Sequence, residues 1–151
     1  MRLPRLREAN LWRSVRRLVF SLVTIGVLLA GIGSQPLAAA ATSLDLVATA
    51  YGPSLADNYP YPPVDFFGHA LRSGDIAVDP KVIPLGSVLR ITGYTSPYLP
   101  SGGMTGVACD EGDAIQGNRI DIFINASDSA VSSFGMQNVT ATLVGRDLAQ
   151  C

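Results

Sequence analysis

The chain has 151 residues, of which 48% are hydrophobic, 11 are Lys or Arg and 12 are Asp or Glu. Six arginines lie within the first 17 residues, so residues 41–151 hold 5 basic and 11 acidic side chains and have a net charge of −6. A domain this acidic repels a phosphate backbone, which argues against nucleic acid as a partner and leaves neutral glycans and amine-bearing peptides. The length after residue 40 suits one domain with one modest core.

Residues 1–40 have the composition of an export signal. The arginines precede an uncharged run over residues 18–33, Pro36 interrupts it, and the alanines of residues 38–41 offer a cleavage site. We therefore expect residues 1–40 to be a signal peptide and residues 41–151 to be one mature domain that is secreted, periplasmic or located in the cell wall. A retained anchor is the alternative, because residues 18–41 are just long enough to cross a bilayer if extended, and a membrane would then be a partner.

Short hydrophobic runs separated by Gly and Pro predict a mainly β domain with six strands, which are enough to close a barrel. One short helix is predicted at residues 128–134, with the Ser127 hydroxyl as its N-terminal cap and Gly135 as its end. The predicted strands are residues 44–51, 74–79, 87–92, 105–110, 119–124 and 138–144.

Two segments between the strands are rich in proline and are expected to be surface loops without regular structure. They are residues 53–73 and residues 94–103. Proline lacks the N–H that a strand ladder needs, so neither segment fits a strand. Both contain tyrosines where these side chains would line a groove.

Cys109 and Cys151 are the two cysteines of the chain. An even pair in an oxidising compartment predicts one disulfide, which would join the last residue to an interior strand. Two free thiols are the alternative.

Alternation along residues 119–124 predicts that Asp121 points to the opposite face from Ile120 and Ile122. A carboxyl group in mid-strand between isoleucines is partly desolvated, which raises its pKa and lets it keep a proton near neutrality, as a general acid must. The alternative is that Asp121 pairs with Arg119 on the same face or meets solvent.

Two more carboxylates, Asp79 and Asp110, end predicted strands. Side chains at strand ends can converge on a shared opening, and converging acids would suit glycosidic chemistry. The alternative for each is a turn or cap role, because Asp readily accepts hydrogen bonds from nearby backbone N–H groups. The acidic run at residues 110–113 lacks the ligand spacing of a calcium loop, and His69 has no neighbouring nucleophile motif. We expect neither a metal nor an organic cofactor.

Three stretches of the sequence together resemble the 3D domain, which is named for three aspartates. They are ATAY at residues 48–51, IAVDPKVIPLG at residues 76–86, and the segment from Asp110 to GNRID at residues 117–121. The domain is similar to the catalytic domain of membrane-bound lytic transglycosylase A and to bacterial wall-lytic and resuscitation-promoting stationary-phase proteins. The resemblance implies a six-stranded double-psi β-barrel and non-hydrolytic cleavage of the MurNAc-GlcNAc β-1,4 bond of peptidoglycan, leaving a 1,6-anhydro-MurNAc end.

The resemblance also implies roles for individual residues. Asp121 would protonate the glycosidic oxygen and then take the proton of the C6 hydroxyl, while Asp110 and Asp79 would orient Asp121, hold its pKa or bind sugar hydroxyls. Tyr51, Gly117 and Asn118 would contact the substrate, whose glycan strands would be the partner of a monomeric protein. A single acid that later becomes the base needs no cofactor.

The chain departs from the family pattern beside the site. Relatives usually read Asp-Thr-Gly-Gly-Ala-Ile where residues 110–115 of this chain read Asp-Glu-Gly-Asp-Ala-Ile. The added carboxylates, Glu111 and Asp113, would help to keep a neighbouring acid protonated but would also repel muramyl peptide carboxylates. The loop at residues 94–106 is also longer than in compact relatives.

Two other functions fit the same residues. The first is a non-catalytic wall-binding or wall-loosening module like the expansins, which share this barrel. The second is an inverting glycoside hydrolase that uses Asp121 as its acid and Asp110 or Asp79 as its base.

Overall fold

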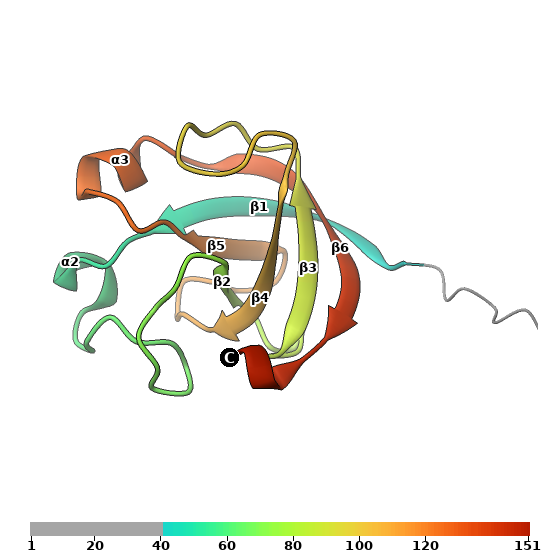
Figure 1. Ribbon diagram of the computed structural model, residues 1–151, viewed down its shortest axis with the longest axis horizontal. Coiled ribbons are helices and arrows are strands. Elements are labelled where there is room, and N and C mark those ends of the chain that lie inside the picture. Colours follow the sequence, from blue (N-terminus) through green and yellow to red (C-terminus); the bar gives the residue numbers. More distant parts are fainter. Residues whose placement is uncertain (1–40) are drawn as a thin grey trace, which may run out of the picture. The chain divides into compact units, whose positions relative to one another are not determined.

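A computed structural model describes residues 41–151, so the expected signal peptide lies outside the described residues (Figure 1). Within residues 41–151, no helix is long and apolar enough to cross a membrane. The described chain forms six strands and three short helical elements. The strands are β1 (Ser43–Tyr51), β2 (Asp75–Val78), β3 (Ser87–Thr92), β4 (Met104–Asp110), β5 (Arg119–Phe123) and β6 (Gln137–Arg146), and the helical elements are α2 (Leu55–Asn58), α3 (Asp128–Ser132) and the 3-10 turn η1 (Leu148–Gln150).

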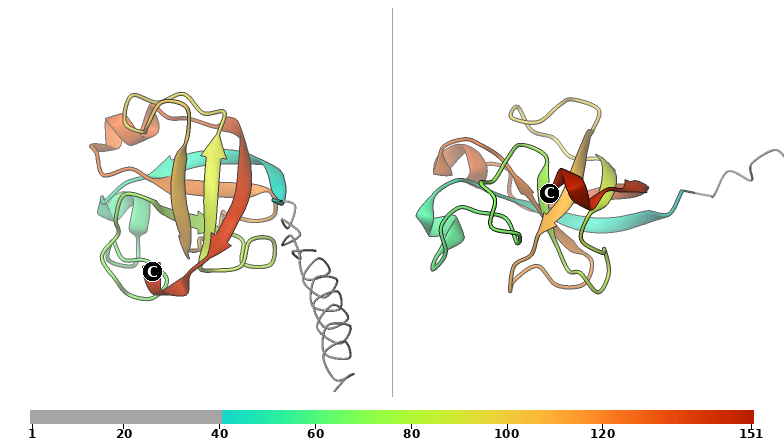
Figure 2. Two further views of the ribbon diagram at one scale, coloured as in Figure 1. Left: turned by 45° about the vertical axis from the view of Figure 1, so that its right-hand side comes forward. Right: turned by 60° about the horizontal axis from the view of Figure 1, so that its bottom comes forward.

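The six strands close into one barrel in the order β1-β5-β2-β4-β3-β6, which confirms the predicted mainly β, six-stranded barrel (Figures 1 and 2). The β1–β5 and β2–β4 pairs are parallel and the other four pairs are antiparallel. Each predicted strand is present, with bounds within two residues of the prediction. Neighbours in the barrel are mostly not neighbours in sequence, so the site is assembled from distant segments.

The barrel is filled by the apolar side chains that point inward from alternate strand positions. Ile76, Ile91, Ile120 and Ile122 are fully buried, and Leu89 is nearly so. Burial of side chains of this size is the main favourable term in folding. The inward face of β5 therefore consists of isoleucines, as its alternation predicts, and the outward face is free to carry polar groups.

The helices differ from the prediction in two ways. Helix α3 ends at Ser132, and the Ser127 hydroxyl does not cap it, because the hydroxyl shares a hydrogen bond with Ser129 Oγ instead. Helix α2 lies inside a segment predicted to lack regular structure, so that prediction was wrong for residues 55–58. These four residues have no proline, and Ser54 Oγ accepts a hydrogen bond from the backbone N–H of Asp57, which caps the helix.

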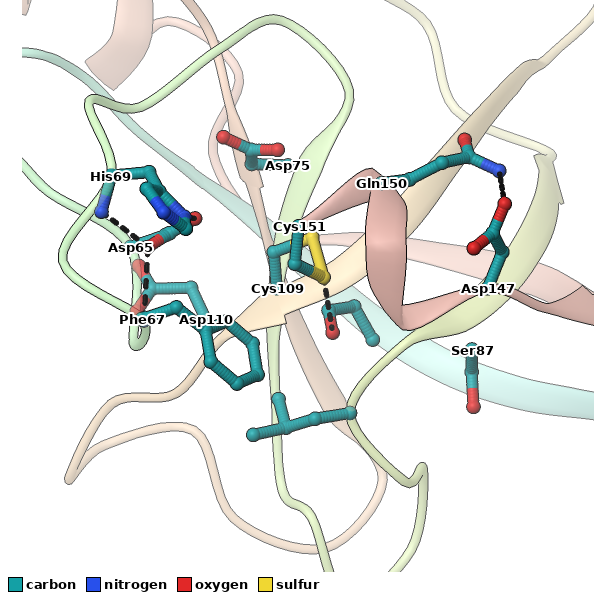
Figure 3. The surroundings of a disulfide bond; sticks show 12 residues. Asp65, Phe67, His69, Asp75, Ser87, Cys109, Asp110, Asp147, Gln150 and Cys151 are labelled. Carbon is teal, nitrogen blue, oxygen red and sulfur yellow. Dashed lines mark hydrogen bonds and ion pairs between the residues drawn. A yellow bond between two sulfur atoms is a disulfide. The ribbon is translucent and has the colours of Figure 1, made fainter.

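Cys109 and Cys151 form the predicted disulfide, with their Cα atoms 5.2 Å apart (Figure 3). The bond holds the C-terminal turn η1 beside the end of β4. Arg72 adds to this anchorage, because its guanidinium donates hydrogen bonds to the carbonyl oxygens of Gln150, at 2.7 Å, and Cys151, at 3.2 Å. The last residue is thus fixed to the strand that ends at Asp110.

Candidate active site

Four residues on four neighbouring strands form a row across the outer face of the barrel. In the pairing register, Thr49 of β1 lies opposite Asp121 of β5, Asp121 lies opposite Ala77 of β2, and Ala77 lies opposite Asp110 of β4. Paired residues point to the same face of a sheet. At a strand spacing of about 4.8 Å, the backbones of Asp121 and Asp110 are roughly 10 Å apart. The side chain of Ala77 between them is small and buried.

A β-bulge brings Asp110 into this row. The register between β2 and β4 shifts after Ile76, which lies opposite Ala108, so that the next residue, Ala77, lies opposite Asp110 rather than Cys109. Without the extra residue, the alternation of β4 would place Cys109 in the row. Bulges of this kind redirect a side chain, and they are frequent beside active sites.

Asp121 is a partly buried acid whose carboxylate is bound by a side-chain hydroxyl. The Thr49 hydroxyl donates a hydrogen bond of 2.8 Å to Asp121 Oδ1. Burial, with a smaller contribution from the negative charge of Asp57, raises the pKa of Asp121 to about 6, against the opposing effects of the hydrogen bonds from Thr49 and the Ile122 backbone and of the charge of Arg119. Within residues 41–151, Asp121 and Arg119 form no ion pair. The predicted desolvated acid is therefore the arrangement found, and the predicted alternative of a pair with Arg119 is not.

Asp110 is bound to Tyr51, which lies on the first strand. The Tyr51 hydroxyl donates a hydrogen bond of 2.9 Å to Asp110 Oδ2, and the backbone N–H of Glu111 donates one of 2.9 Å to Asp110 Oδ1. The Tyr51 ring packs edge-on against Phe123, with the ring centroids 5.4 Å apart. Burial raises the pKa of Asp110 and raises that of Tyr51 strongly, so Tyr51 stays a neutral donor.

Asp79 has a different environment from the other two acids. Its Oδ2 accepts a hydrogen bond of 2.8 Å from the backbone N–H of Gly117, and its Oδ1 accepts one of 3.0 Å from the backbone N–H of Lys81. These backbone donors hold the pKa of Asp79 below its usual value. Asp79 thus ties the turn after β2 to the turn before β5. This is the turn role that the sequence left open as the alternative for this residue.

The other two predicted contact residues lie in the turn that Asp79 holds. Gly117 has a φ of +63°, a conformation that favours glycine, and its N–H is bound to Asp79. Asn118 is exposed, and its carbonyl oxygen accepts a hydrogen bond of 2.9 Å from the backbone N–H of Val47. The turn is therefore fixed at both ends, next to the start of β5.

Two residues that touch or influence Asp121 were not predicted. Thr49 has a sequence signal, because it lies two residues before Tyr51 and so shares its face of β1. Asp57 has none, because its position depends on helix α2, where its Oδ2 accepts a hydrogen bond of 2.8 Å from the backbone N–H of Gly52.

Glu111 and Asp113, the two acids by which this chain departs from the family pattern, are both exposed. The pKa of Asp110 is raised mainly by burial, and the negative charges of Asp65 and Asp75, which are themselves buried, add to the rise. Within residues 41–151, no group of three or more His, Cys, Asp or Glu side chains is arranged to hold a metal ion.

The loop between β3 and β4 borders an open groove of about 440 Å³. Tyr98 lines it together with Arg90, Thr105 and Asn125, as expected for a tyrosine of this loop. None of the three aspartates is among the residues that line this groove. The groove is therefore separate from the row of Asp121 and Asp110.

Comparison with known proteins gives a match to a family model and partial matches to single proteins. Residues 74–145 match the family model described as the 3D domain. Cell wall-binding protein YocH of Bacillus subtilis is 41% identical over 69 residues, which are 46% of this chain and 21% of that protein. The putative cell wall shaping protein YabE of the same species is 47% identical over 55 residues, which are 36% of this chain and 11% of that protein. The matches thus span about a fifth and a tenth of these two relatives.

Three solved structures from bacteria are similar to parts of this chain. Lytic transglycosylase LtgG of Burkholderia pseudomallei is 31% identical, with a TM-score of 0.43 over 54% of this chain and 26% of that one. MltA of Escherichia coli is 21% identical, with a TM-score of 0.45 over 58% of this chain and 29% of that one. A Clavibacter michiganensis expansin is 17% identical, with a TM-score of 0.42 over 69% of this chain and 51% of that one. The match to the 3D domain extends from β2 to β6 and includes Asp79, Asp110 and Asp121.

Proposed function

We propose that this protein is a peptidoglycan lytic transglycosylase in which Asp121 is the catalytic acid. The observation that carries the proposal is the environment of Asp121. This carboxyl group is partly buried on the outer face of the barrel, accepts a hydrogen bond from Thr49, and has a pKa raised to about 6. A group with this pKa can give a proton near neutrality and can also take one back, which suits an acid that later becomes a base.

The reaction begins with protonated Asp121, which gives its proton to the oxygen of the MurNAc-GlcNAc bond. The bond breaks, the GlcNAc side leaves as an alcohol, and positive charge develops on C1 of MurNAc. The Asp121 carboxylate then takes the proton of the C6 hydroxyl of the same MurNAc, whose oxygen bonds to C1. The product is a 1,6-anhydro ring, no water is consumed, and Asp121 is protonated again for the next cycle.

The neighbouring residues have supporting roles in this scheme. Thr49 orients one carboxylate oxygen of Asp121 through the 2.8 Å hydrogen bond. Tyr51 and Asp110 form a hydrogen-bonded pair that can bind sugar hydroxyls on the β4 side of the row. Asp79 fixes the turn before β5 through Gly117, so its role is to position the strand that carries Asp121.

The comparisons support a substrate in the cell wall. The two relatives are named for wall binding and wall shaping, and the first solved structure is named as a lytic transglycosylase. The disulfide fits an oxidising location outside the cytoplasm, where peptidoglycan lies. The negative net charge of residues 41–151 is compatible with a largely neutral glycan backbone.

Inverting hydrolysis is less well supported by the geometry. It requires a carboxylate that is free to activate a water molecule on the opposite face of the sugar. Both oxygens of Asp110 and both oxygens of Asp79 accept hydrogen bonds from the protein. Each of these carboxylates is therefore already bound by two protein donors, which favour its charged form and weaken it as a base.

A non-catalytic wall-binding function is the second candidate, because the relative YocH is named a cell wall-binding protein. Mass spectrometry of the soluble products released from purified sacculi distinguishes the candidates. The wild-type protein is expected to release anhydro-muropeptides, and the Asp121→Asn variant is expected to release none. Products with reducing ends would indicate hydrolysis, and binding to sacculi without any product would indicate the wall-binding function.

A further inference from the structure

We propose that the aromatic loop, defined as residues 55–67, is a platform on which sugar rings of the glycan strand stack beside the acids. Its platform residues are Tyr59, Tyr61, Phe66 and Phe67. The inference rests on the proposed function and deepens it, because the glycan strand that the loop would hold is the substrate on which Asp121 acts. The loop precedes residue 74, so it lies outside the segment that matches the 3D domain.

The aromatic loop concentrates exposed apolar side chains. The exposed fractions are 79% for Tyr59, 71% for Tyr61, 52% for Phe66 and 38% for Phe67. Leu55 of the same loop is 63% exposed. Single exposed apolar residues are ordinary on a protein surface, but a group of them in one short segment is typical of a binding surface.

The loop is held in one shape by polar contacts. The Asn58 side-chain amide donates hydrogen bonds to the carbonyl oxygens of Gly52, at 2.9 Å, and Ser54, at 2.6 Å. Asp65 Oδ1 accepts hydrogen bonds from the backbone N–H groups of Phe67, at 2.9 Å, and His69, at 2.8 Å. A surface that is already ordered loses little conformational entropy when a ligand binds.

The buried Asp65 carboxylate holds the Phe66-Phe67 turn in its conformation. It is 3% exposed, and Oδ2 has no hydrogen-bond partner within residues 41–151 and lies 3.6 Å from His69 Nδ1. The two phenylalanine rings pack edge-to-face with their centroids 5.3 Å apart. Figure 3 shows Asp65, Phe67 and His69 beside Cys109 and Asp110. A buried acid thus holds two exposed rings next to the site.

Both ends of the aromatic loop are attached to the strands that carry the site. At its start, Asp57 accepts a hydrogen bond from the backbone N–H of Gly52, the residue after Tyr51. At its end, the backbone N–H of Phe66 donates a hydrogen bond of 3.1 Å to the carbonyl oxygen of Cys109, the residue before Asp110. In Figure 1, α2 and the segment after it lie at the end of the barrel where β1 ends. The platform therefore continues the surface of the row.

The chemistry of the loop favours a sugar over other ligands. Pyranose rings present C–H groups on one face, and aromatic rings bury such faces while tyrosine hydroxyls stay available for hydrogen bonds. The charged residues of the loop are Asp57 and Asp65, so it offers no cation to an anionic lipid or polymer. A neutral glycan backbone is the occupant that these side chains fit.

The test measures binding without cleavage. The probe is chitohexaose, and the protein is the Asp121→Asn variant, so that binding is read independently of the reaction. The platform variant adds Tyr61→Ala, Phe66→Ala and Phe67→Ala. Because aromatic packing contributes about 0.5–1.5 kcal/mol per ring, each lost ring is expected to weaken binding roughly two- to tenfold in Kd.

Two controls separate stacking from other effects. Phe66→Leu with Phe67→Leu keeps apolar area at the same positions but removes the rings, and it is expected to weaken binding almost as much as Phe66→Ala with Phe67→Ala. Met136→Ser with Val144→Ser removes exposed apolar side chains outside the loop, which are 72% and 56% exposed, and it is expected to leave Kd unchanged. Circular dichroism checks that each variant keeps the barrel.

The outcomes are distinguishable from those of the proposed function. An unchanged Kd in the platform variant would overturn the platform even if anhydro products are found. Unchanged glycan binding by the leucine variant would overturn stacking as the role of the rings. A platform variant that loses self-association but keeps glycan binding would overturn it as well. Selective loss in the platform and leucine variants would support the platform even if the wild type only binds the wall.

Discussion

Asp121 lies on β5 and Asp79 directly follows the neighbouring strand β2, but their surroundings act on them in opposite directions. Asp121 is partly buried and accepts a hydrogen bond from one hydroxyl group, and its pKa rises to about 6. Asp79 is nearly fully buried but accepts hydrogen bonds from two backbone N–H groups, and its pKa falls. Burial alone therefore does not decide the charge of an aspartate here.

The balance between burial and facing hydrogen-bond donors explains the difference, because burial is the largest effect on the pKa of Asp121 and the hydrogen bond from Gly117 is the largest on that of Asp79. Backbone N–H groups aimed at a carboxylate stabilise its charged form, whereas burial without enough donors destabilises it. Asp79 is thus suited to organise a turn as an anion, and Asp121 is suited to hold and transfer a proton. The two residues can be separated experimentally, because the same conservative substitution should affect them differently.

The largest expected difference is in activity. Asp121→Asn removes the proton donor and should lower the rate of anhydro-muropeptide release by about 10²–10⁴-fold, the usual contribution of a general acid. Asp79→Asn keeps one acceptor for the turn and should lower the rate by roughly tenfold or less, since one neutral hydrogen bond contributes about 1 kcal/mol. Product release from sacculi measures both. Equal losses in two folded variants would contradict different roles for the two acids.

The next difference is in stability. The pKa of Asp121 is about 6 in the folded protein and about 4 in an unfolded chain, so the folded state binds more protons between these values. The free energy of unfolding should therefore fall as pH rises from 4 to 7. Asp121→Asn should remove this loss, which is about 3 kcal/mol for a shift of two pKa units, and should be the more stable protein at pH 8.

Asp79 should show the opposite pH dependence. Its pKa is lower in the folded protein, so its stabilising effect is present above the unfolded pKa of about 4 and is lost as pH falls below that value. Asp79→Asn should therefore destabilise the protein at pH 7 and have less effect at acid pH. Urea unfolding of both variants at several pH values tests the comparison, and stability curves that run parallel to the wild type would refute it.

The pH dependence of catalysis follows from the same group. If protonated Asp121 starts the reaction, kcat/KM should be nearly constant below pH 6 and should fall as pH rises above about 6. The decline should approach tenfold per pH unit, as expected for the loss of one essential proton. Initial rates on soluble glycan strands between pH 4.5 and 8.5 give the profile. A rate that keeps rising above pH 7 would exclude Asp121 as the acid.

The orientation of Asp121 could be predicted from the sequence, but its neighbours could not. The alternation of Ile120, Asp121 and Ile122 reports which side of β5 is buried, and it depends on local residues alone. The partner Thr49 depends on the parallel pairing of β1 with β5, two strands that are about 70 residues apart in the chain. Nothing in the local pattern specifies that pairing.

The placement of Asp110 shows a second limit. Alternation along β4 gives Cys109 and Asp110 opposite faces, and only the bulge after Ile76 brings Asp110 opposite Ala77. The position of Asp57 likewise depends on a four-residue helix whose sequence is surrounded by prolines. A bulge is set by the pairing with a distant strand, so it leaves a weak trace in the sequence.

The smallest expected effects come from the two residues that tune Asp121. Thr49→Val keeps the size of the side chain but removes the hydrogen bond to the carboxylate, so the pKa of Asp121 should rise and the decline in kcat/KM should move to higher pH. Asp57→Asn keeps an acceptor for the N–H of Gly52 but removes a negative charge, so the decline should move to lower pH. Each shift should change kcat/KM at pH 7 by less than about tenfold, because one exposed charge or one hydrogen bond contributes about 1 kcal/mol. If the decline in kcat/KM moved in the same direction in both variants, altered packing of the site, rather than the proton affinity of Asp121, would determine the profile.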